Sequence, residues 1–326
     1  MKTNRARSRS TGPDGATHLA IPLSQVGQGD LLLVGGKAVS LAALMRASLP
    51  VPPGFCITAE AFQQFLEGCP RRTELSSLLS QALPAQPDEV QRLSEQVFGC
   101  LDRVAVPQTV ARAILAEWRA CGTERAYAVR SSATLEDAAA HSFAGQFDSF
   151  LNVQDSDALI EAVRRCWLSL FSARALMYHA KNGLPVAQSA MAVVVQEMVH
   201  AEVAGVLFTI DPTTRKTDRV VIESAAGLGD RVVGGRVAPD RIILDKSSLT
   251  VRARTSGGQV PGARMVLDER SAQQLAVLSR CVEETLAGPL DIEWAIHGGA
   301  IYLLQARPAG KGHRPVRSWK ERQIWS

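Results

Sequence analysis

The chain has 326 residues, a length that allows one large core or two medium cores. Apolar residues make up 46% of it and charged residues 21%, which is ordinary for a soluble globular protein. The net charge of +4 comes largely from the two ends of the chain rather than from a continuous basic face, so the composition argues against a nucleic-acid-binding protein.

The six cysteines never form a C-x-x-C pair, and residues 1–13 are basic and polar with no apolar run behind them. This pattern indicates reduced thiols, no zinc site and no secretory signal. The longest apolar stretches, near Ala192 and Ala204, are too short to cross a bilayer. We therefore expect a cytoplasmic protein with no membrane or nucleic-acid partner.

The first half of the chain alternates short strands with helices. Residues 1–20 lack apolar periodicity and are expected to form a disordered tail. The patterns predict strands at 30–34, 55–57 and 126–131, helices at 59–67 and 158–181, a helix that starts at 37 and is stopped by residues 51–54, a proline-broken helical stretch over 73–118, and a hairpin over 142–153.

The second half is richer in β-branched runs. Strands are expected at 192–198, 203–209, 220–224 and 241–245, a helix at 271–286, and a hairpin of 290–296 with 300–305. The sequence thus predicts a mixed α+β or α/β protein of two unequal lobes, 21–188 and 189–310, with the boundary near 183–191 and a tail at 311–326.

Two glycine stretches have the composition of phosphate-binding loops. Gly36-Lys37 is not a Walker A motif, because Leu31 stands at its first glycine position and Ala38 replaces the hydroxyl residue. The stretch from Gly227 to Gly229 lacks the third glycine of a dinucleotide fingerprint. Each of them, taken alone, is better interpreted as a tight turn.

The hairpin near residue 300 carries a more informative set of side chains. Asp291 and Glu293 lie on one face of a strand because side chains alternate, and Gln305 and Arg307 share a face of the facing strand. Mg²⁺ prefers such oxygen ligands together with substrate phosphates. An exposed hairpin with a cross-strand Glu–Arg pair explains the same residues, and both interpretations stay open. Arg130, at the end of an apolar strand, is either a site residue or a salt-bridged edge residue.

Five long segments, in this order, carry a family resemblance: GGKAVSLAALMRASLPVPPGFCIT, YAVRSSATLEDAAAHSFAGQFDSFLNV, VVVQEMVHAEVAGVLFTIDP, IESAAGLGDRVVGGRVAPDRIILDK and DIEWAIHGGAIYLLQARP. Over residues 27–310 the chain resembles the ATP-binding domain of the phosphoenolpyruvate synthase and pyruvate phosphate dikinase family, which includes rifampin phosphotransferases. The resemblance implies an ATP-grasp fold with the nucleotide held between two lobes, and ATP and Mg²⁺ as cofactors.

The resemblance also implies roles for individual residues. Lys37 and Arg130 match the family's phosphate-binding cations, and Arg307 its transition-state arginine; these three are the expected catalytic residues. Gly145 matches the loop that covers the phosphates, with Ser149 a little beyond it. Gln196, Met198 and Val199 match the segment that meets the adenine, with Val203 nearby. Glu293 and Gln305 match the family's Mg²⁺ ligands, and Asp291 stands where a further carboxylate would lie.

Departures from the family pattern leave several functions open. Complete family enzymes continue into a swivelling domain whose histidine accepts the phosphoryl group, and none of the six histidines here stands in such a context, although His141 precedes the expected phosphate loop. Ala226 and Asp230 also replace the family's usual residues. We expect a phosphotransferase that needs a separate phosphohistidine carrier; the alternatives are a kinase that phosphorylates a small molecule and gives ADP, and a nucleotide-binding module without turnover.

Overall fold

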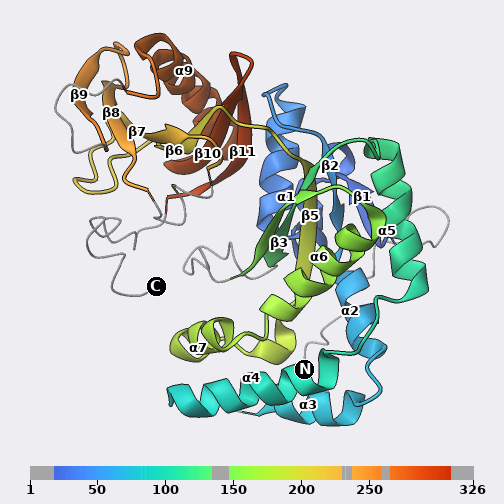
Figure 1. Ribbon diagram of the computed structural model, residues 1–326. Coiled ribbons are helices and arrows are strands. Elements are labelled where there is room, and N and C mark those ends of the chain that lie inside the picture. Colours follow the sequence, from blue (N-terminus) through green and yellow to red (C-terminus); the bar gives the residue numbers. More distant parts are fainter. Residues whose placement is uncertain are drawn as a thin grey trace, which may run out of the picture.

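The computed structural model describes residues 18–81, 83–84, 86–133, 147–229, 232, 237–257 and 265–309. Within these ranges the strands form two antiparallel sheets, and each sheet carries its own helices (Figure 1). The mixed helix-and-sheet fold with two lobes, predicted from the sequence, is confirmed. Expectations for the two tails, for residues 142–146 and for Asp230 lie almost wholly outside the described residues.

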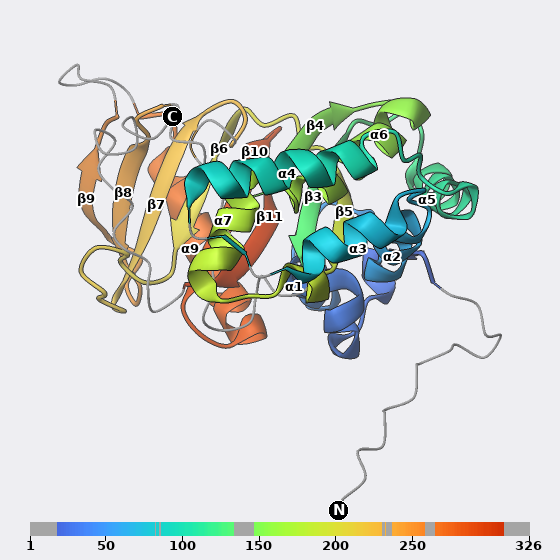
Figure 2. The same ribbon diagram turned by 90° about the horizontal axis from the view of Figure 1, so that it is seen from below.

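The first lobe is built on a sheet with strand order β1-β2-β5-β3-β4. Aromatic side chains at the centre of its main core pack closely, with the rings of Phe65 and Trp167 5.1 Å apart. Helices α3, α4 and α7 lie together below the sheet (Figures 1 and 2). Its elements are β1 (Ala20–Pro22), α1 (Leu31–Arg46), β2 (Gly54–Ile57), α2 (Ala59–Glu67), α3 (Arg72–Ser80), α4 (Pro87–Leu101), α5 (Gln108–Cys121), β3 (Tyr127–Ala133), β4 (Ser149–Val153), α6 (Ser156–Ser169), α7 (Ala173–Asn182) and β5 (Met191–Glu197), with short 3-10 turns at Leu23–Gln25, Gln28–Asp30 and Val186–Gln188.

The second lobe is a sheet with strand order β11-β10-β6-β7-β8-β9, covered on one face by α9. Trp294 and Leu275 are buried between the sheet and this helix. The elements are β6 (Val203–Phe208), β7 (Arg219–Ala226), β8 (Asp240–Asp245), β9 (Val251–Thr255), α9 (Glu269–Leu286), β10 (Leu290–His297) and β11 (Ala300–Pro308). All were predicted within a few residues except β9, whose sequence alternates apolar and polar residues but is only five residues long and mostly exposed, which makes a weak signal.

The chain crosses from the first lobe to the second at a later residue than the sequence predicted. Strand β5 is hydrogen-bonded between β2 and β3 at the centre of the first sheet, so the chain enters the second sheet only at Val203. The expected boundary at 183–191 precedes β5. We therefore place the division between the lobes at residues 198–202.

Helix α1 packs against both lobes. Leu41 lies in a core formed with β2 and β5, whereas Leu44, one turn later, is buried in the core of the second lobe. By length and composition alone, the 19 residues Gln28–Arg46 are apolar enough to cross a membrane, with a mean hydropathy of 1.2. That is weak evidence, because a core helix of a globular protein passes the same test, and here Val34, Leu41 and Leu44 are fully or almost fully buried in protein.

The first turn of α1 corrects the prediction of a strand at 30–34. Residues 31–34 are helical, and the helix is interrupted at Gly35, where φ is +72° and ψ is 164°. An apolar run of four residues does not distinguish a buried strand from a helical turn. The Val34 carbonyl, which the interruption leaves free, accepts a hydrogen bond of 2.9 Å from the Ser132 hydroxyl of β3.

The expected helix at 158–181 is two helices, α6 and α7. Ser172 ends the connection between them, because its hydroxyl accepts a hydrogen bond from the Ala175 N–H and caps α7. A serine before a helical run is an N-terminal signal, and the continuous apolar pattern on either side concealed it.

Substituting Gly35 by alanine is expected to destabilise the protein strongly. A Cβ at this position would lie 2.4 Å from the Ser132 carbonyl oxygen, and the backbone conformation is one that only glycine adopts readily. We expect a loss of at least about 3 kcal/mol in the free energy of unfolding, measured by urea titration.

Gly183→Ala is the matched control, because Gly183 also has a positive φ of +62° but a Cβ there would meet no atom within 4 Å. It should cost only about 1 kcal/mol. Equal losses in the two variants would show that the contact with β3 contributes nothing.

Candidate functional site

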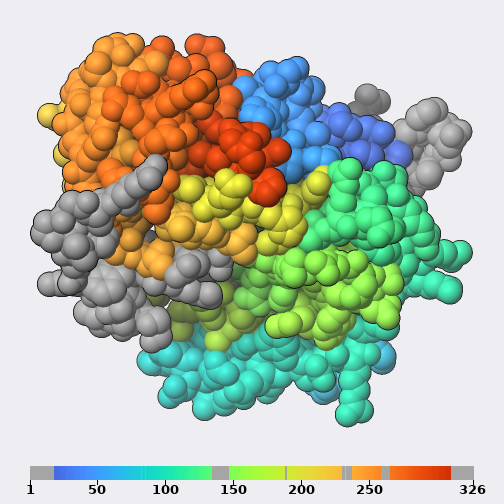
Figure 3. Space-filling view, turned by 45° about the horizontal axis from the view of Figure 1, so that its top comes forward, coloured from blue at the N-terminus to red at the C-terminus, as the bar shows by residue number. Residues whose placement is uncertain are grey.

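A cavity of about 430 Å³ lies where the two lobes meet. Figure 3 shows this region of the surface, with the orange and red second lobe beside the blue and green first lobe and yellow residues between them. The lining residues come from both sheets and from the connector: Lys37, Ala128, Arg130, Phe147, Asp148, Ser149, Leu151, Arg174, Gln196, Glu197, Met198, Val199, Ala201, Ala204, Gly205, Leu228, Gly229, Glu293, Trp294, Ala295, Leu304 and Gln305.

Two cations of the first lobe point into the cavity. Lys37 follows the break in α1, and its ammonium group donates a hydrogen bond of 2.5 Å to the carbonyl oxygen of Ser131 on β3. Arg130 is the one residue of β3 that is not fully buried. The Gly35–Ser132 contact therefore holds the start of the α1 helix, and Lys37 with it, against the strand that carries Arg130.

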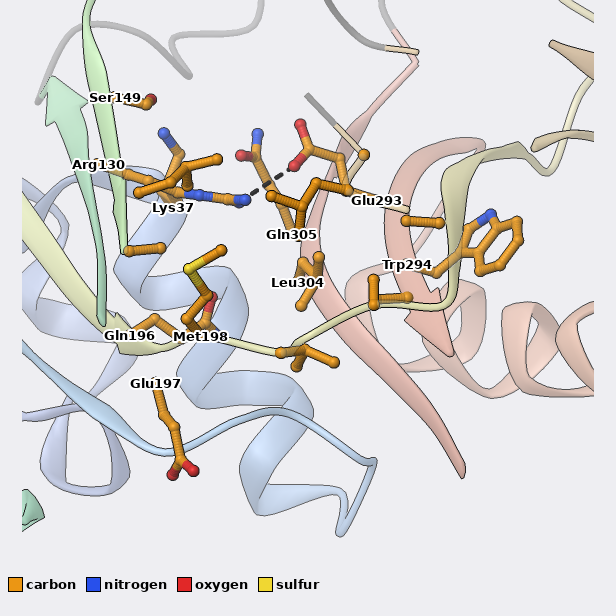
Figure 4. A pocket seen from close by; sticks show the side chains of 18 of the residues that line it. Lys37, Arg130, Ser149, Gln196, Glu197, Met198, Glu293, Trp294, Leu304 and Gln305 are labelled. Atoms are coloured by element: carbon orange, nitrogen blue, oxygen red, sulfur yellow. Dashed lines mark hydrogen bonds and ion pairs between the residues drawn. The ribbon is translucent and has the colours of Figure 1, made fainter. Parts of the chain in front are cut away.

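An ion pair joins the lobes across the cavity. The Arg130 Nη1 lies 3.0 Å from the Glu293 Oε2, and the two side chains are only 15% and 21% exposed. Figure 4 shows Lys37, Arg130, Glu293 and Gln305 pointing toward one another, with the ion pair between them. Because the pair is mostly shielded from water, removing one partner would leave the other charge partly buried and would cost more than at an exposed pair.

The hairpin of β10 and β11 supplies the oxygen donors. Glu293 pairs with Gln305 across the strands, and Trp294 pairs with Leu303, so Leu304 is an extra residue in a β-bulge. Leu303 and Ala306 both face the core, which leaves the consecutive residues Leu304 and Gln305 to line the cavity. A strict two-residue alternation, from which the site was argued, does not anticipate this arrangement.

These donors fit Mg²⁺ in kind and number. Glu293 and Gln305 present a carboxylate and an amide oxygen from adjacent positions of the hairpin, and Mg²⁺ commonly takes one or two protein oxygens and fills its remaining positions with water and phosphate. Among the described residues, no group of three or more His, Cys, Asp or Glu side chains forms a metal cage. The arrangement suits a metal that arrives with a phosphate ligand.

Asp291 and Arg307 lie two cross-strand pairs further along the hairpin and do not line the cavity. Arg307 donates to a single oxygen of Asp291 from Nε at 3.0 Å and from Nη2 at 2.6 Å, and Asp291 is buried. The structure thus separates these two expected site residues from Glu293 and Gln305 and engages them with each other.

The other end of the cavity is lined by the connector after β5. Gln196 is buried and donates to the carbonyl oxygen of Pro52 at 3.3 Å. The Met198 sulfur accepts a hydrogen bond of 3.1 Å from the backbone N–H of Asn152, a residue with a φ of +59°. Glu197 points away from the cavity and pairs with Arg125 (Figure 4).

Of the remaining predicted residues, Ser149 and Val199 line the cavity, whereas Val203 does not. Val203 packs on the core side of the second sheet, on the face that carries Leu207. Gly145 lies outside the described residues.

Sequence reasoning missed Arg174 and Asp148, which also line the cavity. Their nearest charged atoms are 3.6 Å apart, and each side chain is about half exposed. Arg174 is carried by α7, which was predicted only as part of a longer helix over 158–181. No local pattern signals that this helix reaches the cleft.

Asp211, in one of the five family-like segments, has a structural role in a turn after β6. Burial alone would raise the pKa of this carboxyl group, but hydrogen bonds from Thr214 and from the backbone N–H of Thr213 outweigh it and hold the pKa below its ordinary value. The carboxylate lies outside the cavity lining and orders the turn.

The chain thus belongs to the class of two-lobed α+β proteins whose cleft sets cations opposite metal-compatible oxygens. The family described as the pyruvate phosphate dikinase AMP/ATP-binding domain matches residues 31–322, and the chain belongs to that family. The family resemblance seen in the sequence is therefore confirmed.

Several curated proteins are similar over most of this chain. A probable phosphoenolpyruvate synthase from Methanothermobacter thermautotrophicus is 36% identical over 94% of this chain and 48% of its own length. The prodigiosin synthesizing transferase PigC from Serratia marcescens is 39% identical over 87% of this chain and 32% of its own length. The rifampicin phosphotransferase from Bacillus subtilis is 33% identical over 89% of this chain and 36% of its own length.

The chain spans about half or less of the length of these relatives. Among solved structures, D-alanyl-alanine synthetase A from Vibrio cholerae overlaps 88% of this chain and 59% of its own at 12% identity and a TM-score of 0.35, which is too low to carry an argument.

The ion pair between Arg130 and Glu293 is expected to contribute measurably to the stability of the protein without ligand. In a double-mutant cycle of Arg130→Gln, Glu293→Gln and the double variant, we expect a coupling energy of about 1 kcal/mol in urea unfolding at low salt. The coupling should shrink as salt is added, since the pair is partly reached by solvent. A coupling energy of zero at low salt would mean that the two side chains do not interact in solution.

Proposed function

We propose that this chain has an ATP-grasp fold, binds Mg·ATP in the cleft between its lobes, and passes a phosphoryl group to a histidine of a separate carrier domain. The observation that carries the proposal is the convergence of Lys37, Arg130, Glu293 and Gln305 on one cavity. Phosphoryl transfer depends on positioning and on neutralising charge, and these four side chains offer two cations and two metal-compatible oxygens for that purpose.

Each residue has a distinct part in this proposal. Lys37 turns its ammonium group from the Ser131 carbonyl to the phosphates, and Arg130 contacts the transferred phosphoryl group. Glu293 and Gln305 would hold Mg²⁺, which would supply positive charge to offset that of the phosphates. Arg307, the proposed transition-state arginine, lies further along the same hairpin and is held by Asp291 through Nε and Nη2, and Asp291 is the proposed further carboxylate of the metal site.

The base is proposed to bind at the opposite end, against residues 196–199. Met198 offers an adaptable apolar surface, and Asn152 holds its sulfur in place. Gln196 is fixed by its bond to Pro52 and limits the depth of the base site. Ser149 lies at the phosphate end, beyond Arg130 in Figure 4.

The acceptor is proposed to come from outside the described cavity. None of the described residues that line it is a histidine, so a phosphohistidine intermediate requires a side chain brought in from elsewhere. His141, the nearest sequence candidate, lies outside the described residues. The longer relatives have room for further domains, which is consistent with a carrier that visits the cleft. We also propose a cytoplasmic location, where ATP and reduced thiols are available.

The adenylate product tests this function. Binding is measured by the rise in melting temperature with Mg·ATP, which mass action requires of any ligand of the native state. The product is then identified by chromatography, with and without a carrier domain excised from a related phosphoenolpyruvate synthase. AMP and inorganic phosphate, together with acid-labile phosphate on the carrier histidine, support the proposal, since the β-phosphoryl group then ends on the histidine and the γ-phosphate is released to water. ADP would indicate direct phosphorylation of a small molecule, and binding without turnover a non-catalytic module.

Lys37→Ala is expected to weaken Mg·ATP binding about 10- to 100-fold and to lower turnover, because one charged contact to phosphate is worth roughly 1.5–3 kcal/mol. Calorimetric titration measures the affinity. Lys216→Ala, in an exposed turn of the second lobe, is the control and should bind like the parent protein. An unchanged affinity in Lys37→Ala would remove this residue from the phosphate site.

A further inference from the structure

The charges that point into the described part of the cavity nearly balance. Its cations are Lys37, Arg130 and Arg174, and the carboxylates that face it are Asp148 and Glu293, because Glu197 of the lining points away and pairs with Arg125. A polyanion that enters without a metal ion therefore meets only one net positive charge from these side chains. A site that simply concentrated phosphate would be expected to carry a larger excess of cations.

The cations are also engaged one by one. Arg130 pairs with Glu293 at 3.0 Å, Arg174 lies 3.6 Å from Asp148, and Lys37 donates to a backbone carbonyl. The Arg130–Glu293 pair is more shielded from water than the Arg174–Asp148 pair, and it joins the two lobes. Phosphate can take the place of Glu293 at the Arg130 Nη1 only if this pair opens.

We propose that the Arg130–Glu293 pair selects metal-bound nucleotide over free nucleotide by an exchange of partners. Free ATP would have to separate the pair and leave the Glu293 carboxylate next to its own phosphates, where like charges repel. A metal-bound nucleotide brings a partner for each side chain, with the cation going to Glu293 and the phosphate to Arg130. This inference rests on the proposed function and concerns how the same site is regulated.

The exchange explains why one carboxylate serves two purposes. In the empty cleft Glu293 neutralises Arg130, so that neither charge is left partly buried without a partner, which would cost far more than the pair gains. In the loaded cleft the same carboxylate is the metal ligand. Glu293 therefore makes metal binding and the release of Arg130 a single event.

The test compares the affinities for ATP in excess EDTA and for Mg·ATP by calorimetric titration. The parent protein should bind Mg·ATP at least about tenfold more tightly than free ATP. Glu293→Gln should reverse the order, binding free ATP about tenfold more tightly than the parent does and Mg·ATP more weakly. Glu202→Gln removes the same charge from an exposed residue of the connector outside the cavity and should behave like the parent.

A double variant separates the exchange from simple relief of repulsion. If Arg130 is the group that Glu293→Gln releases, adding Arg130→Gln should abolish the gain in free ATP binding. Melting curves without ligand establish that each variant is folded, and the comparison of the two nucleotide forms on the parent protein needs no variant at all.

The outcomes distinguish this inference from the proposed function. The inference is overturned if Glu293→Gln binds free ATP no more tightly than the parent, if the double variant keeps the gain, or if the parent binds both forms equally. If the parent protein binds neither form, the proposed nucleotide site itself is wrong.

Discussion

The close approach of the Gly35 backbone to strand β3 fixes the geometry of the cleft. A side chain at this position would collide with Ser132, so the break in α1 and the strand are in direct contact. Lys37 is two residues beyond the contact on one side, and Arg130 is two residues before it on the other. Two cations of the candidate site thus have their separation set by main-chain packing rather than by flexible side chains, which is the kind of preorganisation that electrostatic catalysis needs.

Helix α1 carries this constraint into the second lobe. Leu41 packs in the first lobe and Leu44 in the second, and the backbone N–H of Leu303 donates to the carbonyl oxygen of Pro50 just beyond the helix. The two sheets are therefore joined through a packed helix as well as through the connector at 198–202. Motion between the lobes has to be accommodated around α1, so the cleft can change its width at the far end more readily than beside this helix.

The sequence was sufficient for most elements of the fold, because long runs of β-branched residues and amphipathic helices are local signals. It failed at 30–34, where four apolar residues fit a strand or a helical turn, and at Ser172, whose capping role divides a helix. The expected site residues were argued partly from strand alternation and mostly from a family likeness, and eight of them line one cavity in the structure. The sequence did not predict which residues pair across the cavity or that Arg174 lines it. Both depend on how α7 packs and on how the two sheets meet, and neither has a local signature in the sequence.

Because of the bulge at Leu304, the site is sensitive to the insertion or deletion of a residue, which substitutions do not test. Leu303 and Ala306 face the core on either side of the two cavity residues, so the function of the strand depends on the number of residues between them. Losing one residue here would restore regular pleating and rotate one of the cavity positions toward α9. In the evolution of this hairpin, single-residue insertions and deletions at Leu304 would therefore be selected against more strongly than most exchanges of one amino acid for another.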